Sequence, residues 1–220
     1  MRIIFFTTLF CLQILRGYAQ EKTLVSKNFK FQDGLYWSFE HLQKNKPDVL
    51  WDTLETRLVT NPASLMTHVE FLKFKKQTSL LPVDSVYCLV IDGIPYIRLP
   101  VMTQKRSSAV FAGLALRGKL CYYQYEDVEE KQVQITAYIP ETGQPYASKY
   151  ITQKKDVVRE KLLLFETGEI IDFTLNNFKD LIKKDKDLLQ TVSSLKPKEV
   201  KEKLFKCLLI YNDRNPVYLF

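Results

Sequence analysis

The sequence predicts an α+β protein in which hairpins of a mostly antiparallel sheet come first and two C-terminal helices follow. Up to residue 173, short segments rich in β-branched and aromatic residues alternate with turn residues, as in a series of strand hairpins. After residue 173, the apolar residues recur at the three- and four-residue spacing of amphipathic helices. Apolar residues make up 46% of the chain, so we expect a buried core rather than disorder.

The first predicted element is a short helix that begins at Phe39. Ser38 is its expected N-cap, because a serine hydroxyl can accept a hydrogen bond from a free backbone N–H group. Pro47 is expected to end this helical region, since proline disfavours the helical conformation of the residue before it. Two strands are expected next, over residues 49–58 and 65–74, with an Asn-Pro break between them.

The clearest hairpin joins residues 86–91 to residues 94–99. Its turn is Asp92-Gly93, a pair that tolerates the positive φ angles of a type I′ turn. Pro95 has no N–H group to donate to a neighbouring strand, so we expect the return strand to lie at a sheet edge there.

The middle of the chain contains more strand candidates, and two stretches between them have turn-like or strongly polar composition. The strands are predicted over residues 108–116, 119–125, 133–139, 161–165 and 169–173. The acidic residues 126–131 predict a loop, and residues 140–150, which contain a Thr-Gly pair and a proline, predict a turn or loop.

Helices are predicted for the C-terminal part. Thr174 is a suitable cap for the first helix, which breaks near Asp185. The last helix begins near Pro197, because proline is tolerated in a first turn. Its apolar stripe consists of Val200, Leu204, Cys207, Leu208 and Tyr211.

The first nineteen residues have the pattern of a secretory signal peptide. Arg2 precedes an apolar run over residues 3–15, and the small residues Gly17 and Ala19 stand at the −3 and −1 positions before Gln20. The run is too short and too interrupted for a convincing membrane span. We therefore expect an exported chain, in the periplasm, at the cell surface or outside the cell, with no integral membrane span once the leader is removed.

The expected domain organisation follows from this leader. It comprises a signal peptide over residues 1–19, a flexible N-terminal segment over residues 20–33 and a single α+β domain over residues 34–220. The formal net charge is +7, and removal of Arg2 and Arg16 with the leader leaves +5. Such a mild excess fits a lysine-rich solvated surface, and it also permits attraction to anionic surfaces.

Three cysteines remain after the leader: Cys88, Cys121 and Cys207. Buried free thiols are the preferred interpretation, because cysteine packs well as a small apolar residue. The alternative is a disulfide between Cys88 and Cys121, which both lie in predicted strands.

The sequence contains no catalytic or cofactor signature that we recognise. His41 and His68 have no cysteine or histidine partner at metal-ligand spacing, so no metal site is predicted. There is no GxSxG elbow and no glycine-rich phosphate loop, so neither a serine nucleophile nor a nucleotide cofactor is expected. A nucleic acid partner is not expected either, because the one suggestive basic run, residues 73–76, is short and the chain is expected to be exported.

The segment over residues 34–47 resembles a recurrent opening in uncharacterised exported proteins of Bacteroidetes, which reads approximately GxYxSFExxxxNKP. The residues that match this motif are Gly34, Tyr36, Ser38, Phe39, Glu40, Asn45, Lys46 and Pro47, while His41, Leu42 and Gln43 differ from it. The resemblance implies an envelope or secreted location and supplies no catalytic residues. The motif can be a structural device, because turn and cap chemistry explains its polar members.

The preferred function is that of a non-catalytic binding protein, secreted or in the cell envelope, whose partner is an envelope protein, glycan or lipid. Tyrosine and tryptophan provide large contact areas with a polar end, so they are the candidate ligand-binding residues. They are Tyr36, Trp37, Trp51, Tyr122, Tyr123 and Tyr125. One alternative is an envelope polymer hydrolase that uses a carboxylate pair such as Glu40 and Asp52. Another is an architectural subunit of an envelope assembly.

Overall fold

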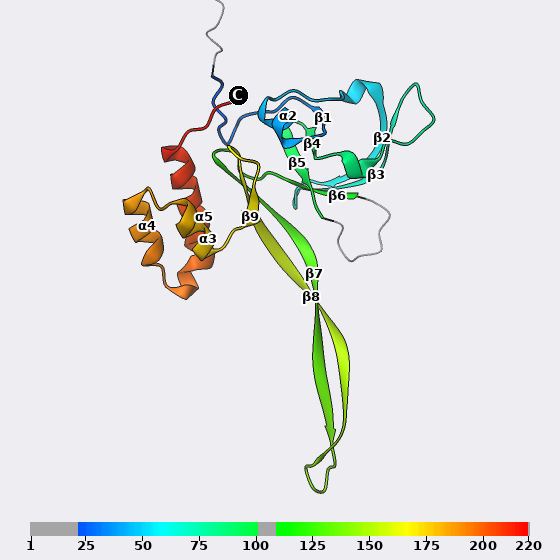
Figure 1. Cartoon of the computed structure of the whole chain (residues 1–220), viewed down its shortest axis with the longest axis vertical. Helices are drawn as coiled ribbons and strands as arrows, with labels where there is room; N and C mark the ends of the chain where they lie inside the picture. The colour runs from blue at the N-terminus through cyan, green and yellow to red at the C-terminus, as the bar shows by residue number, and fades with distance from the viewer. Residues whose placement is uncertain (1–21, 101–108, 220) are drawn as a thin grey trace, which may run out of the picture.

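The computed structural model describes residues 22–100 and 109–219 as an α+β protein with two antiparallel sheets and a group of C-terminal helices (Figure 1). The predicted α+β class and its mostly antiparallel pairing are therefore confirmed. Three helices, rather than two, follow the strands, and one short helix lies near the start of the described chain. The helices are α2 (Phe39–Gln43), α3 (Leu175–Leu181), α4 (Lys186–Ser193) and α5 (Pro197–Arg214).

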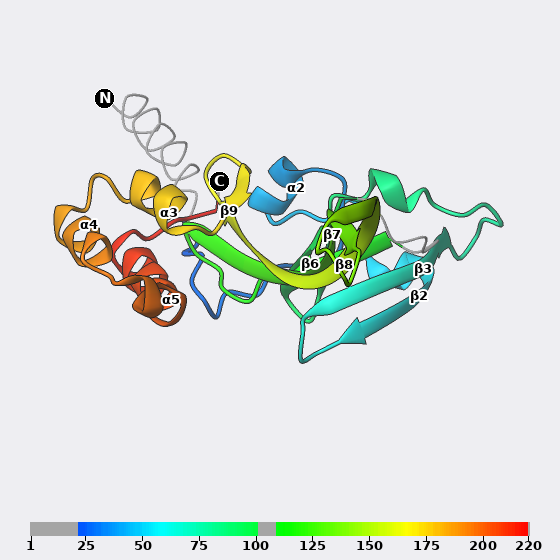
Figure 2. The same cartoon turned by 90° about the horizontal axis from the view of Figure 1, so that it is seen from below.

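The larger sheet has six strands and the smaller sheet has three. In spatial order, the larger sheet contains β1 (Gly34–Tyr36), β4 (Cys88–Ile91), β5 (Ile94–Arg98), β6 (Ala109–Gly113), β3 (Met66–Phe74) and β2 (Leu54–Asn61). The smaller sheet contains β7 (Leu120–Tyr138), β8 (Pro145–Leu164) and β9 (Ile170–Asp172). Seen from below, it lies between the helices at one end of the molecule and the larger sheet at the other (Figure 2).

The Asp92-Gly93 hairpin forms as predicted, with φ angles of 55° and 78° at its two turn residues. The position of Pro95 differs from the prediction, because β5 lies inside the six-stranded sheet rather than at its edge. The proline is tolerated because β6 pairs with β5 only from Tyr96 onwards. The carbonyl oxygen of Pro95 still accepts a hydrogen bond, from the Leu114 N–H at 2.8 Å.

The largest difference from the sequence prediction is the length of β7 and β8. Residues 126–131, predicted as a loop, belong to β7, and most of residues 140–150, predicted as turn or loop, belong to β8. The turn itself is confined to residues 139–144, where the Gly143 N–H donates to the Ile139 carbonyl at 2.8 Å. The two strands therefore form a long hairpin that projects far beyond the rest of the molecule (Figure 1).

The body-proximal part of the smaller sheet is buried on both faces. Cys121, Tyr123 and Leu163 pack into a core shared with the larger sheet. Tyr122 and Leu162 face the other way and pack beneath the C-terminal helices. This matches the alternation in the sequence, which places aromatic side chains on both faces of this strand.

The three cysteines of the described chain are free and buried, as the preferred interpretation predicted. Burial raises the pKa of the Cys121 thiol to about 12 and also raises the pKa of Cys88. Neither thiol is therefore activated as a nucleophile, since catalysis needs an accessible thiolate.

The helix caps agree with the sequence. The Thr174 hydroxyl accepts from the Asn177 N–H at 3.2 Å, and the Asp185 carboxylate accepts from the Leu188 N–H at 3.0 Å. Pro197 occupies the first turn of α5. These caps end one helix and start the next, which lets three short segments fold over one face of the small sheet.

The first described residues are anchored to the body, although a flexible segment was expected over residues 20–33. Val25 and Phe31 are buried, and the Val25 N–H donates to the Val217 carbonyl at 2.8 Å. The predicted signal peptide, residues 1–19, lies outside the described residues. Over residues 22–100 and 109–219, no helix combines the length and the apolar character that a membrane crossing requires.

We predict that Gly168→Ala destabilises the protein more than Gly143→Ala. Both glycines have positive φ, 78° and 69°, so an alanine at either position costs about 1 kcal/mol of backbone strain. A Cβ atom at residue 168 would also lie 2.4 Å from Cδ1 of Phe39, whereas nothing lies within 4 Å at residue 143. The free energy of unfolding, measured by urea titration, should fall at least twice as far for Gly168→Ala. Equal losses in the two variants would contradict the packing of this turn on α2.

Candidate functional site

The six aromatic residues predicted to bind a ligand do not form a common surface. Four of them, Tyr36, Tyr122, Tyr123 and Tyr125, are buried, and the two tryptophans are half-buried. They are also divided among three separate hydrophobic clusters of the described chain. Their large apolar areas thus contribute mainly to the protein interior.

The polar ends of three of these aromatic side chains, those of Tyr36, Trp51 and Tyr122, are hydrogen-bonded within the protein. The Tyr122 hydroxyl donates to Glu160 Oε1 at 2.6 Å, and the Tyr36 hydroxyl donates to the Gln32 carbonyl at 2.7 Å. Burial raises the pKa of both phenols above its usual value, so both stay protonated at neutral pH. These contacts indicate structural roles.

The motif over residues 34–47 is explained by its own geometry. Gly34 adopts φ +149°, and a Cβ atom there would lie 2.5 Å from the Val49 carbonyl oxygen. Asn45, also at positive φ, accepts a hydrogen bond from the Gln32 N–H at 2.7 Å. Ser38 caps α2 through the His41 N–H at 3.3 Å. The motif therefore closes a tight turn around a short helix, as the structural interpretation predicted.

The carboxylates of the hydrolase hypothesis serve other contacts. Glu40 forms an ion pair with Lys44, one helical turn away, and this lysine lowers the pKa of Glu40. A glycosidase acid needs the opposite, a carboxyl group with a raised pKa that faces a second one across a cleft. Neither Glu40 nor Asp52 lines the pocket found in the described chain. The geometry thus gives the hydrolase hypothesis no support from this pair.

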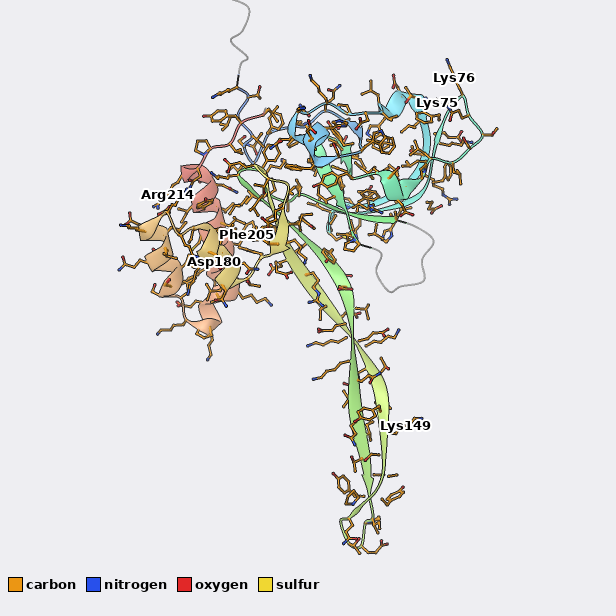
Figure 3. All side chains as sticks on the ribbon, in the orientation of Figure 1. Lys75, Lys76, Lys149, Asp180, Phe205 and Arg214 are labelled. Atoms are coloured by element: carbon orange, nitrogen blue, oxygen red, sulfur yellow. The ribbon has the colours of Figure 1, made fainter. Side chains whose placement is uncertain are left out.

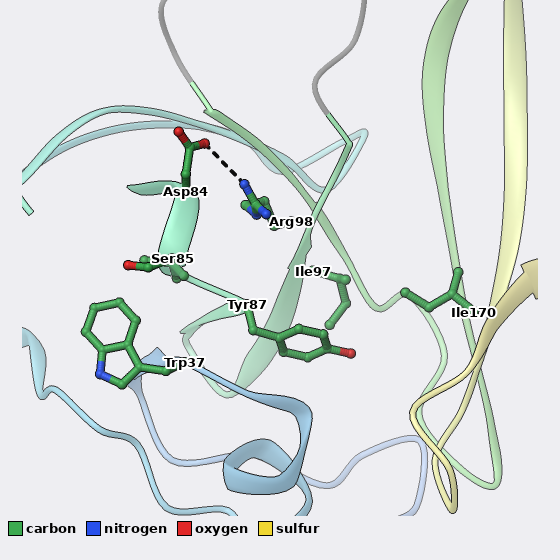
Figure 4. Close-up of a pocket in the computed structure, with 8 residues that line it drawn as sticks. Trp37, Asp84, Ser85, Tyr87, Ile97, Arg98 and Ile170 are labelled. Atoms are coloured by element: carbon green, nitrogen blue, oxygen red, sulfur yellow. Dashed lines mark hydrogen bonds and ion pairs between the residues drawn. The ribbon is translucent and has the colours of Figure 1, made fainter. Parts of the chain in front are cut away.

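That pocket is shallow and lies between the larger sheet and β9 (Figure 4). Its volume is ≈ 230 Å³, below the roughly 300–1,000 Å³ of typical small-molecule sites. Arg98 reaches across it to Asp84 at 3.1 Å. The residues that line it are Trp37, Asp84, Ser85, Val86, Tyr87, Ile97, Arg98 and Ile170. Trp37 is thus the single member of the predicted aromatic set at this pocket.

Metal ligation has no counterpart in the described residues, which contain no group of three or more His, Cys, Asp or Glu side chains suited to a metal ion. His41 instead pairs with Asp48, with Nδ1 2.7 Å from a carboxylate oxygen. The same carboxylate accepts from the Trp37 N–H at 2.8 Å. This pair therefore fixes the exit from α2.

The feature that sequence reasoning missed is the far part of the long hairpin. We define residues 126–158 as the arm, which leaves the body as a two-stranded ribbon (Figure 1). Within the arm, the shaft comprises residues 126–132 and 152–158, and the tip comprises residues 133–151. In the part of the chain that the structure describes, no strand pairs with the outer edges of the arm.

The shaft is highly charged. It carries eight charged side chains in its fourteen residues. An ion pair crosses between its strands, with Glu130 and Lys154 2.9 Å apart, and at its base Asp127 lies 3.3 Å from Arg159, the next residue after the shaft. A ribbon with charged cross-strand pairs is compatible with water on both sides, and its charges also oppose edge-to-edge aggregation.

The tip differs sharply from the shaft, since Glu141 and Lys149 are its only charged residues. Lys149 projects from the far part of the arm (Figure 3). Four large side chains are mostly exposed there: Tyr138 at 59%, Tyr146 at 67%, Tyr150 at 65% and Ile135 at 50%. The tip is thus an aromatic surface that the protein holds away from its own core.

The two faces of the tip have different chemistry. One face carries the cross-strand pairs Val133–Ile151 and Ala137–Ala147. The opposite face is polar, with the Thr136 and Ser148 hydroxyls hydrogen-bonded at 3.1 Å. The alternation of apolar and polar residues over 133–137 was sufficient to predict a strand. It did not show that this strand would stay uncovered in the described structure.

No protein-family model matches this chain, and no curated protein or solved structure matches it either. The candidate site is therefore identified by geometry and composition alone. These define an α+β protein that presents a two-stranded ribbon with an aromatic tip.

We predict that Tyr36→Phe destabilises the protein while Tyr150→Phe does not. The first variant leaves the Gln32 carbonyl without its buried donor, which costs about 1 kcal/mol. The Tyr150 side chain is 65% exposed, so its phenol contributes little to folding. The free energy of unfolding of each variant, from urea titration, tests this. A loss of stability in Tyr150→Phe would show that the tip is part of the folded core.

Proposed function

We propose that this chain is a non-catalytic binding protein of the cell envelope or the extracellular space, and that it binds its partner through the tip of the arm. The main support for this proposal is the amino-acid composition of the tip. Protein-binding surfaces are depleted in charged residues and enriched in tyrosine, and the tip has both properties. The exposed tyrosines provide large contact areas at low conformational cost.

The physical chemistry of a two-stranded ribbon supports the same proposal. An isolated hairpin is only marginally stable in water, and three strands or a covering layer are normally required. Charged cross-strand pairs suit the shaft to water, whereas the tip exposes mostly apolar and aromatic side chains. A partner that covers the tip would supply the missing layer.

The envelope location is part of the proposal and draws on the leader-like residues 1–19 and the motif resemblance. If the leader is removed as proposed, the chain purified from native cells should begin at Gln20, as seen by mass spectrometry of its N-terminal peptide. Recovery of the uncleaved N-terminus from the cytoplasm would contradict export and leave the tip proposal intact.

A tip-less variant tests the binding role directly. Gln132 and Thr152 are cross-strand partners, so an Asn-Gly turn between them can replace residues 133–151 and close the shaft. We expect this variant to keep the thermal stability of the parent, because the deleted residues contribute nothing to the buried core. We expect it to lose co-sedimentation with envelope fragments from native cells.

The matched control is Arg98→Ala, which alters the pocket and leaves the arm intact. It should bind as the parent does. Full binding by the tip-less variant, or loss of binding in Arg98→Ala alone, would place the interaction elsewhere and overturn the proposed function.

A further inference from the structure

The tip has few charged residues all round: one, Glu141, lies at its turn, and one, Lys149, lies on the face of Val133 and Ala137. Ile135 lies on the same face as Val133 and Ala137, opposite Lys149. Tyr150 lies on the other face, opposite Gln134. Tyr138 and Tyr146 stand next to the turn, where the strand register shifts. Exposed apolar or aromatic side chains therefore surround the tip.

Contact between the tips of two copies would be too small for a stable dimer. Six residues of strand extend about 20 Å, and a two-stranded ribbon is about 10 Å wide, so one face measures roughly 200 Å². Face-to-face packing of two tips would bury on the order of 400 Å², while specific interfaces bury about 1,000 Å² or more. A partner that encloses both faces and the turn would bury an area close to this 1,000 Å².

The pocket between the larger sheet and β9 does not provide such an enclosure, because its volume of ≈ 230 Å³ is too small for a two-stranded ribbon. A lipid bilayer does not suit the tip either, because the outer edges of the ribbon carry backbone groups that hydrocarbon cannot satisfy. The tip also carries a single lysine with which to attract anionic headgroups.

We propose that the tip inserts into a groove of a folded partner protein, which contacts both faces of the ribbon and closes around the turn. This inference rests on the proposed function and specifies its partner. The groove has a wall against Val133, Ile135 and Ile151 that is apolar except for an acceptor group opposite Lys149, which lies on the same face. It has a polar wall against the face that carries Thr136 and Ser148. Insertion stops at the Gln132–Thr152 pair, where the charged shaft begins, so its depth is about 20 Å.

Site-specific photo-crosslinking tests this geometry. A benzoylphenylalanine is placed in turn at Ile135, at Tyr150 and at Lys154 of the full chain. Each variant is mixed with envelope extract from native cells and irradiated. We expect Ile135 and Tyr150, which lie on opposite faces, to label one and the same protein, and we expect Lys154 on the shaft to label it weakly or not at all. Ile135→Ala and Tyr150→Ala should each reduce capture of that protein about 10-fold, as expected for interface anchors.

Each of the following outcomes would contradict insertion of the tip into a groove. Labelling from one face only indicates a flat docking surface, and a product of twice the chain mass indicates a second copy. Tip-dependent co-sedimentation with vesicles of phosphatidylethanolamine and phosphatidylglycerol indicates a lipid partner. All three results would preserve the proposed binding role of the tip, whereas full envelope binding by the tip-less variant would remove that role itself.

Discussion

The burial of β7 and β8 at their roots is the constraint on which the rest of the structure depends. Both faces are covered there, by the six-stranded sheet on one side and by the C-terminal helices on the other. The Asn212 side chain of α5 adds two hydrogen bonds to the main chain of Leu120, at 2.9 and 2.8 Å. A ribbon that is held on both faces leaves the body in a defined direction, as the proposed binding role of the arm requires.

The body that holds this root is stabilised by contacts among its own side chains. Its polar side chains are largely engaged with one another, as in the His41–Asp48 and Tyr122–Glu160 pairs. Its buried thiols have raised pKa values and are inaccessible. Functional sites normally leave some groups with unusual exposure or chemistry, and the tip gathers four of the large apolar or aromatic side chains that the described chain leaves exposed.

Local signals in the sequence were sufficient for many elements. Ser38 and Thr174 act as helix caps, and the Asp92-Gly93 turn forms its hairpin, because each depends on residues only a few positions apart. The arm could not be predicted in this way, since the partners of its acidic residues are far along the chain. Glu130 pairs with Lys154, so a stretch that looks like a polar loop on its own becomes a strand once its complement is alongside.

The candidate site shows a second limit of prediction from local sequence. Tyr122 and Tyr123 were expected to lie in a strand and to bind a ligand, and their burial shows that they pack into the core instead. Composition identifies tyrosine as a contact residue, but it does not say whether the contact is made by the protein's own core or by a partner. The distinction depends on what covers each strand segment: β7 is enclosed as far as Tyr125, and in the described structure its tip has no cover. A tyrosine in the enclosed part packs into the core, whereas one at the tip has most of its surface free for the partner that the proposed function requires.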